Sequence, residues 1–241
     1  MEAYLLALAY AAMPALGNFA GGVLAELLPV SRRMLSLALH GAAGIVLAVV
    51  GLELLPRAFA AGSPIVPVVA FVVGGGFYLA VDVGIERIRA ARGGGAGGAW
   101  GIWFGVAMDL FSDGVMIGTG ALLSPALGFL LALGQVPADL PEGFATIATF
   151  RERGVPRRVR LALAAAFALP ILLGTTIGFW LVRGQPEIVQ LSLLAFTGGV
   201  LTTVVVEEIV PEAHAGAEVR LATVVFVAGF ALFALLSAYL G

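Results

Sequence analysis

Eight long apolar runs are the feature that most constrains the fold of this chain. Each run has the length of about 20 residues that an α-helix needs to cross a hydrocarbon core of about 30 Å. Short segments with Pro, Gly, Ser or Arg separate the runs, which cover roughly residues 3–28, 34–56, 65–88, 99–122, 126–149, 159–183, 189–211 and 218–240. The sequence therefore predicts an all-α integral membrane protein with eight transmembrane helices.

The composition excludes several other classes of protein. Charged residues make up 12% of the chain and hydrophobic residues 61%, whereas about 25% of the residues of a soluble domain are charged. Eight spans use nearly all of the 241 residues, so we expect one transmembrane domain over residues 1–241 and no soluble domain. The chain has no Cys, which excludes thiolate metal sites and disulfides. It also lacks a basic stripe, so nucleic acid is not an expected partner.

The arginines predict the orientation of the chain in the membrane. All 13 basic residues are Arg, and the even-numbered connections between the runs hold only Arg57 and Arg183. The odd-numbered connections hold the others, which are Arg32, Arg33, Arg87, Arg89, Arg92, Arg151, Arg153, Arg157, Arg158, Arg160 and Arg220. Because positive charge accumulates in cytoplasmic loops, we expect a multi-pass protein of the cell (inner) membrane with both termini external.

The second and seventh runs match each other at an offset of 155 residues. The matched pairs are Gly44 and Gly199, Val49 and Val204, Val50 and Val205, Glu53 and Glu208, Pro56 and Pro211, and Ala58 and Ala213. The second run is predicted to cross the membrane outward and the seventh inward, as in the inverted repeats of transporters. The alternative is a chance match between Gly- and Val-rich helices, although Glu and Pro are uncommon in these runs.

Acidic residues occur inside the fourth and fifth runs, where a charged side chain costs roughly 2.5–3.5 kcal/mol unless it has a partner. Asp109 and Asp113 are four residues apart, and Asp139 and Glu142 are three apart, so each pair lies on one helix face. The two pairs lie at similar distances from the Ser124-Pro125 corner. We therefore expect the four carboxylates to converge between two antiparallel helices.

A divalent cation is the partner that best fits these carboxylates. No basic residue lies in the middle of a run to neutralise them, and like charges placed together repel each other. Oxygen-only ligation suits magnesium, calcium or manganese, and iron(II) is also compatible, whereas zinc and copper more often recruit His or Cys. The alternative is a relay of protonated carboxyl groups. No organic cofactor is expected.

Four further polar residues are candidates for a transport pathway. Glu207 and Glu208 lie toward the inner end of the seventh run, where Glu208 with Glu207 would form an inner waypoint. Glu53 lies near the outer end of the second run and would guard that end of the path. Gln135 lies one turn before Asp139 and either lines the external approach or bonds to a neighbouring helix.

The chain resembles the ZIP family of divalent metal transporters along its whole length. The resemblance rests on Ala138-Asp139-Leu140-Pro141-Glu142-Gly143, on Asp109-Leu110-Phe111-Ser112-Asp113-Gly114, and on the Glu-x-x-Pro ends that begin at Glu53 and Glu208. It implies eight spans in a 3+2+3 arrangement, external termini, and a metal site between the fourth and fifth helices on repeated His-Asn-x-Pro-Glu-Gly motifs. The sequence leaves the oligomeric state open, although homodimers are common among transporters of this type and a homodimer is one candidate assembly.

The resemblance also assigns roles to individual residues. Asp109 stands where the family has a His, whereas Asp113 and Glu142 stand at acidic ligands. Asp139 stands where the family has an Asn or Asp that joins a second metal. Ala138 replaces a His, and Ile171 replaces a Glu ligand of the sixth span. These replacements favour a single site of three or four carboxylates over a binuclear zinc centre.

The resulting hypothesis is uptake of zinc or a harder ion, such as manganese or iron(II), by alternating access between two helix bundles. The lipid bilayer and the metal ion are then the expected partners, and the protein is not expected to be an enzyme. Two alternatives remain open at this point. One is an intramembrane aspartyl-type enzyme, although its Gly-x-Gly-Asp signature is missing; the other is a membrane sensor that binds metal without moving it.

Overall fold

The computed structural model describes residues 1–28, 31–60, 64–91, 97–214 and 219–240, and the side chains of residues 85, 86, 88–91, 97–102 and 219 lie outside this description. In these residues every regular element is a helix. The helices form eight consecutive segments. They are α1 (Glu2–Leu27), α2 (Arg32–Ala48) with η1 (Val49–Leu54) and α3 (Leu55–Phe59), α4 (Ile65–Ala91), α5 (Gly97–Leu123), α6 (Pro125–Glu152), α7 (Arg157–Ala166) with α8 (Ala168–Val182), α9 (Glu187–Val204) with η2 (Val205–Ile209) and α10 (Val210–His214), and α11 (Val219–Leu240).

The lengths and composition of these segments are those of membrane spans. Seven of the segments in the described residues are long and apolar enough to cross a bilayer. The segment outside this group is α6, which is 28 residues long but carries polar residues such as Gln135, Asp139 and Glu142. The predicted multi-pass, all-helical membrane protein is thus confirmed, and the helices lie over the predicted runs to within a few residues.

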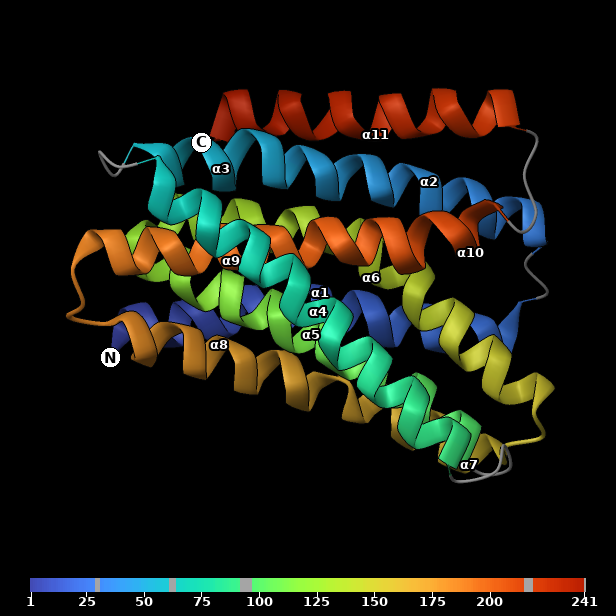
Figure 1. Cartoon of the computed structure of the whole chain (residues 1–241). Helices are drawn as coiled ribbons and strands as arrows, with labels where there is room; N and C mark the ends of the chain where they lie inside the picture. Colours follow the sequence, from blue (N-terminus) through green and yellow to red (C-terminus); the bar gives the residue numbers. More distant parts are fainter. Residues whose placement is uncertain (29–30, 61–63, 92–96, 215–218, 241) are drawn as a thin grey trace.

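The segments pack into two groups of four. The most extensive contacts are those of α1 with α6, α5 with α8, α4 with α9, and α2 with α11. Helices α1 and α5 each contact the other and both α6 and α8, and these four form a first bundle, whereas α2, α4, α9 and α11 form a second (Figure 1). The bundles meet where α2 packs on α6 and α5 packs on α9. The 3+2+3 arrangement along the chain stays a prediction.

The internal repeat is visible in the packing as well as in the sequence. A Cβ added to Gly44 would lie 2.0 Å from the carbonyl oxygen of Phe226, and one added to Gly199 would lie 1.9 Å from that of Phe71. Gly199 follows Gly44 by 155 residues, and Phe226 follows Phe71 by 155 residues, so the two contacts join equivalent positions. Equivalent glycines therefore bring equivalent backbones together in the two halves, which argues against a chance match.

Each repeat also contains one π-helical turn at the same place. The turns η1 and η2 end just before Pro56 and Pro211, respectively. Because proline has no backbone N–H and its ring crowds the preceding turn, the helix widens there and then continues. The predicted ends at residues 56 and 211 were too early, since α3 runs on to Phe59 and α10 to His214. Glu53 and Glu208 both lie within these wide turns, which occur frequently at functional sites.

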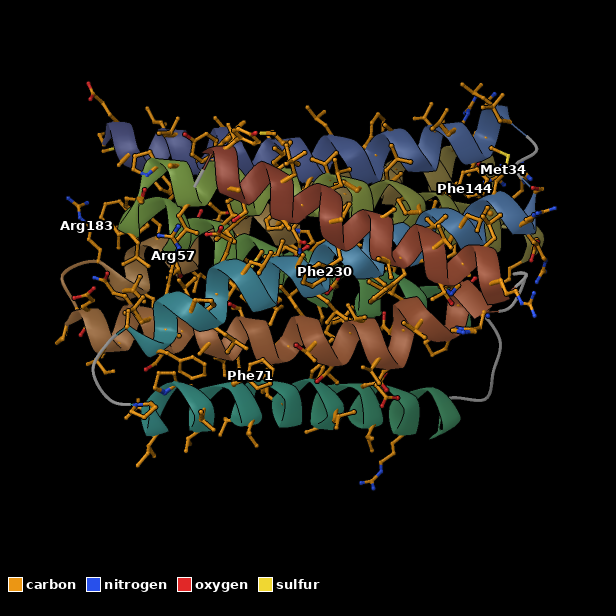
Figure 2. All side chains as sticks on the ribbon, turned by 90° about the horizontal axis from the view of Figure 1, so that it is seen from above. Met34, Arg57, Phe71, Phe144, Arg183 and Phe230 are labelled. Carbon is orange, nitrogen blue, oxygen red and sulfur yellow. The ribbon has the colours of Figure 1, made fainter. Side chains whose placement is uncertain are left out.

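The outer surface of the second bundle is apolar. Helix α4 lies at the edge of the molecule in Figure 2, and its exposed side chains include Val72, Val73 and Phe77. Helix α11 exposes Val224, Val227 and Leu235. Such faces would be unfavourable in water and are the expected contact with lipid tails.

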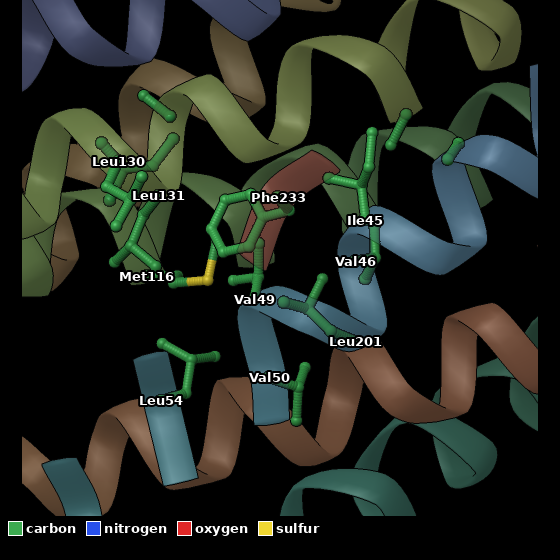
Figure 3. Close-up of a cluster of buried hydrophobic side chains, with 14 of the residues drawn as sticks. Ile45, Val46, Val49, Val50, Leu54, Met116, Leu130, Leu131, Leu201 and Phe233 are labelled. Atoms are coloured by element: carbon green, nitrogen blue, oxygen red, sulfur yellow. The ribbon is translucent and has the colours of Figure 1, made fainter. Parts of the chain in front are cut away.

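A cluster of fully buried apolar side chains joins the two bundles (Figure 3). We call it the apolar plug and define it as Val49, Leu54, Met116, Leu130, Leu131 and Phe233. Along α5 and α6 it lies on the side of the α5–α6 corner, between that corner and the acidic residues at 109–113 and 139–142.

Candidate metal site

The corner between α5 and α6 sets the depth of the acidic residues. Ser124 alone separates the two helices, and Pro125 begins α6 at a position where no N–H is required. A Cβ on Gly128 would lie 2.6 Å from the Cα of Ala121, so the two backbones touch next to the corner. The helices therefore leave the corner as close antiparallel neighbours, as the sequence predicts.

The structure brings the four predicted carboxylates together. Asp109, Asp113 and Asp139 are 6%, 0% and 1% exposed, respectively, and Glu142 is half-buried. Electrostatic repulsion connects Glu142 to each of the other three, and it also connects Asp109 with Asp113 and Asp139. Four negative groups thus share one buried region between α5 and α6.

Two side-chain amides face these carboxylates. The Gln135 Nε2 group of α6 donates a hydrogen bond to Asp113 Oδ1. The Asn18 Nδ2 group of α1 donates to Glu142 Oε2 over 3.5 Å. Both amides are buried, with Asn18 at 0% and Gln135 at 1% exposure. Each amide therefore neutralises no charge but orients one carboxylate.

Five buried oxygen atoms of this region have no hydrogen-bond partner. These atoms are Asn18 Oδ1, Asp109 Oδ1, Asp113 Oδ2, Gln135 Oε1 and Asp139 Oδ2. In the described residues, no other buried side-chain nitrogen or oxygen lacks a hydrogen-bond partner. Buried polar atoms are normally paired, because an unpaired one costs about 1–3 kcal/mol. Five oxygen acceptors cannot form hydrogen bonds with one another, because none of them carries a proton to donate. They require donors or a cation.

The carboxylates do not form a finished coordination shell in this conformation. Over the described ranges, no three Asp, Glu or His side chains are arranged so that they could hold a metal ion directly. Ion binding at this site therefore requires side-chain rotations that bring the oxygens to one point.

A cavity of about 530 Å³ opens next to the carboxylates. We call it the acidic vestibule, because Asp109, Glu142, Glu207, Glu208 and Glu212 are among the residues that line it. A smaller cavity of about 140 Å³ shares Ala145, Thr149 and Glu212 with the vestibule and continues to Arg32, Arg151 and Glu152. The vestibule thus leads from Asp109 and Glu142 to the end of the bundle where α2 begins and α6 ends.

Of the four pathway candidates, Gln135 bonds to Asp113 of the neighbouring helix, and the other three fall into two separate places. Glu208 and Glu207 line the acidic vestibule, where Glu207 is exposed and Glu208 accepts a hydrogen bond from the Tyr78 hydroxyl. Glu53 does not join them. It is buried, forms an ion pair with Arg57 at 2.9 Å, and accepts a hydrogen bond from Ser237.

Sequence reasoning did not single out Asn18 or Tyr78. Each is an isolated neutral polar residue in an apolar run, and its partner comes from a distant helix. The signal that could have found Asn18 is its amide, which would be unsatisfied in a lipid-facing position of the first run. Nothing in the sequence indicates that His40 and His214 are neighbours, but their ring centroids lie 5.0 Å apart.

A comparison with known families gives a match to a family of metal transporters. The model of a family described as ZIP Zinc transporter matches residues 86–237, which is more than half of the chain. The matched region contains the four carboxylates and Glu208 but not α1 with Asn18. No curated protein matches the chain at a significant level.

Proposed function

Because the chain belongs to the ZIP zinc transporter family, whose members move divalent metals across membranes and are not enzymes, we propose that it takes up a divalent metal ion through the site between α5 and α6. Asp109, Asp113, Asp139 and Glu142 are the proposed ligands. The observation that carries the proposal is the group of buried, unpartnered oxygens, which lie among these carboxylates. A divalent cation would satisfy these oxygens and reduce the repulsion at the same time.

The proposed ion is manganese or iron(II) in preference to zinc. The unpartnered atoms are all oxygens, and in the described residues His40 and His214 pack beside each other and do not line the vestibule. Hard, octahedral ions prefer such oxygen ligands, whereas zinc usually recruits nitrogen or sulfur. A competition panel of manganese, iron(II), magnesium, cobalt, cadmium and zinc in a flux assay tests this preference. Strict selectivity for zinc would contradict it.

The proposed direction of transport is toward the cytoplasm. The acidic vestibule leads to the end of the bundle that carries Arg32 and Arg151, and Arg-rich connections mark the cytoplasmic side. Toward the other end, the apolar plug closes the space between the two bundles. This arrangement supports an inward-facing state of an alternating-access cycle, with Glu208 and Glu207 on the exit path.

The decisive experiment compares metal flux in two double variants. In proteoliposomes, Asp113→Asn with Glu142→Gln should lower manganese uptake by at least about tenfold, since losing even a partner of a metal ligand often has that effect. The matched control is Glu2→Gln with Glu187→Gln, which removes two exposed carboxylates outside the site and should leave flux unchanged. Retained flux in the first variant would refute the site. Tight, stoichiometric binding by the unaltered protein without any flux would favour a sensor.

A further inference from the structure

We infer that Asn18 of α1 is a further oxygen ligand of the transported ion and helps to set its selectivity. The inference rests on the proposed function, because it concerns the same site. It adds to the site a helix that neither the acidic motifs nor the matched family region includes.

The position of Asn18 fits this role. Its side chain is fully buried, and the Nδ2 group donates to Glu142 Oε2. The same amide leaves Oδ1 without any partner. A carboxylate always faces the N–H side of an amide, so the amide oxygen remains available to a cation that Glu142 also binds.

The backbone holds Asn18 firmly against α6. A Cβ on Gly143 would lie 2.0 Å from the carbonyl oxygen of Asn18, so only glycine permits this contact. Because Gly143 follows Glu142 directly, the two backbones fix the amide and the carboxylate relative to each other. A site held on packed helices is better defined than one on a loop.

Helices α5 and α8 form the same kind of backbone contact, but without an oxygen ligand. A Cβ on Gly114 would lie 2.1 Å from the carbonyl oxygen of Ile171, and Gly114 follows Asp113 just as Gly143 follows Glu142. Asn18 and Ile171 are therefore counterparts. Ile171 is buried and apolar and offers no oxygen, so the site gains a neutral ligand on one side only.

A neutral oxygen has a specific effect on ion selection. The four carboxylates already exceed the charge of a divalent ion, and a further carboxylate would add repulsion. An amide oxygen raises the coordination number without adding charge. High coordination by oxygen favours manganese and magnesium, whereas zinc sites are usually four-coordinate.

The test measures initial uptake of manganese and of zinc in proteoliposomes. Asn18→Leu keeps the size of the side chain and should lower manganese uptake by about tenfold, with a smaller loss for zinc. Asn18→His supplies a nitrogen ligand and should shift the manganese-to-zinc ratio toward zinc. Asn18→Asp retains an oxygen but adds a fifth carboxylate to the site, so it should lower manganese uptake while keeping the preference for manganese over zinc. The matched control is Thr197→Val in α9, which changes a buried polar residue bonded only within its own helix.

The outcomes separate this inference from the proposed function. If the unaltered protein transports no divalent metal, the proposed function fails and the inference with it. Transport by the unaltered protein and its loss in Asp113→Asn with Glu142→Gln would support the proposed function. In that case, an unchanged manganese-to-zinc uptake ratio in both Asn18→Leu and Asn18→His overturns the inference about Asn18 and leaves the proposed function standing. A structural role for Asn18 would lower the uptake of both ions equally in all three variants. Elution of each variant as a monodisperse peak checks that it is folded.

Discussion

Asn18 and Gln135 have the same chemical relation to the carboxylates at the scale of single residues. Each donates an N–H group to one carboxylate and keeps its own oxygen unpartnered. A donor stabilises the charged form of a buried carboxylate, and it does so here without a competing positive charge. The amides thus allow Asp113 and Glu142 to remain available to a cation.

The donor role of Gln135 can be tested by stability. Gln135→Leu leaves Asp113 buried without its donor, which should lower the free energy of unfolding by about 1–3 kcal/mol in metal-free protein. Added manganese should restore part of this loss, because the ion gives Asp113 a new partner. The measurement is the melting temperature in detergent with and without manganese.

The control for Gln135 is Gln190→Leu in α9. Gln190 donates to the Val182 and Gln185 carbonyls near an exposed helix start, where water can replace the lost contact. Its melting temperature should change little and should not depend on manganese. Equal melting temperatures for the Gln135 and Gln190 variants would contradict the donor role.

The candidate site was predictable from sequence only where spacing carries information. Asp109 with Asp113 and Asp139 with Glu142 repeat at helical intervals about a short corner, so their depth and face follow from helix geometry. Asn18 and Tyr78 are single residues whose partners lie on distant helices. Nothing in a local pattern encodes such a contact, and the position of α1 against α6 depends on the whole bundle.

Glycine is the residue that determines how closely the helices approach each other. In α4, a Cβ on Gly74 would lie 2.0 Å from the Phe196 carbonyl oxygen, whereas Gly76 has nothing within 4 Å. Small residues at helix contacts allow this backbone approach, which is typical of membrane helices. The two glycines therefore differ in role although they are two residues apart.

This difference predicts opposite outcomes for one substitution. Gly74→Ala should destabilise the protein by about 1–3 kcal/mol or more, because backbone must move to accommodate the methyl group. Gly76→Ala meets open space and should be neutral or slightly stabilising, since alanine favours helix. Thermal unfolding of both variants in detergent measures the effect. A Gly74→Ala variant as stable as Gly76→Ala would contradict the observed contact between α4 and α9.

Helix positions followed from the apolar runs, but the π-helical turns did not. Apolar length fixes where a span lies because the bilayer fixes it. Pro56 and Pro211 are visible in the sequence, and the apolar pattern predicts helix ends at them. A proline near a helix end either stops the helix or begins a new turn in which its missing N–H is not needed. Here the helices continue, because α3 packs against α9 and α10 packs against α2.

The two ends of the whole molecule differ in their access to the site. One end leads through the acidic vestibule to Asp109 and Glu142, and toward the other end the apolar plug packs between the two bundles. The start of α1 and the end of α11 lie at the plug end, opposite α7 (Figure 1). In the proposed orientation, the acidic vestibule therefore faces the cytoplasm, and the apolar plug lies between the site and the outside.

Single cysteines test this asymmetry directly, since the chain contains none of its own. Thr149→Cys places a thiol where the two cavities meet, and it should react with a membrane-impermeant maleimide in inside-out vesicles but not in intact cells. Leu130→Cys lies in the apolar plug at 0% exposure and should react from neither side in this state. Exposed Glu187→Cys and Arg153→Cys report the outer and inner surfaces, respectively. Reaction of Thr149→Cys from outside, with Glu187→Cys reacting only from inside, would reverse the proposed orientation and place the acidic vestibule on the external side.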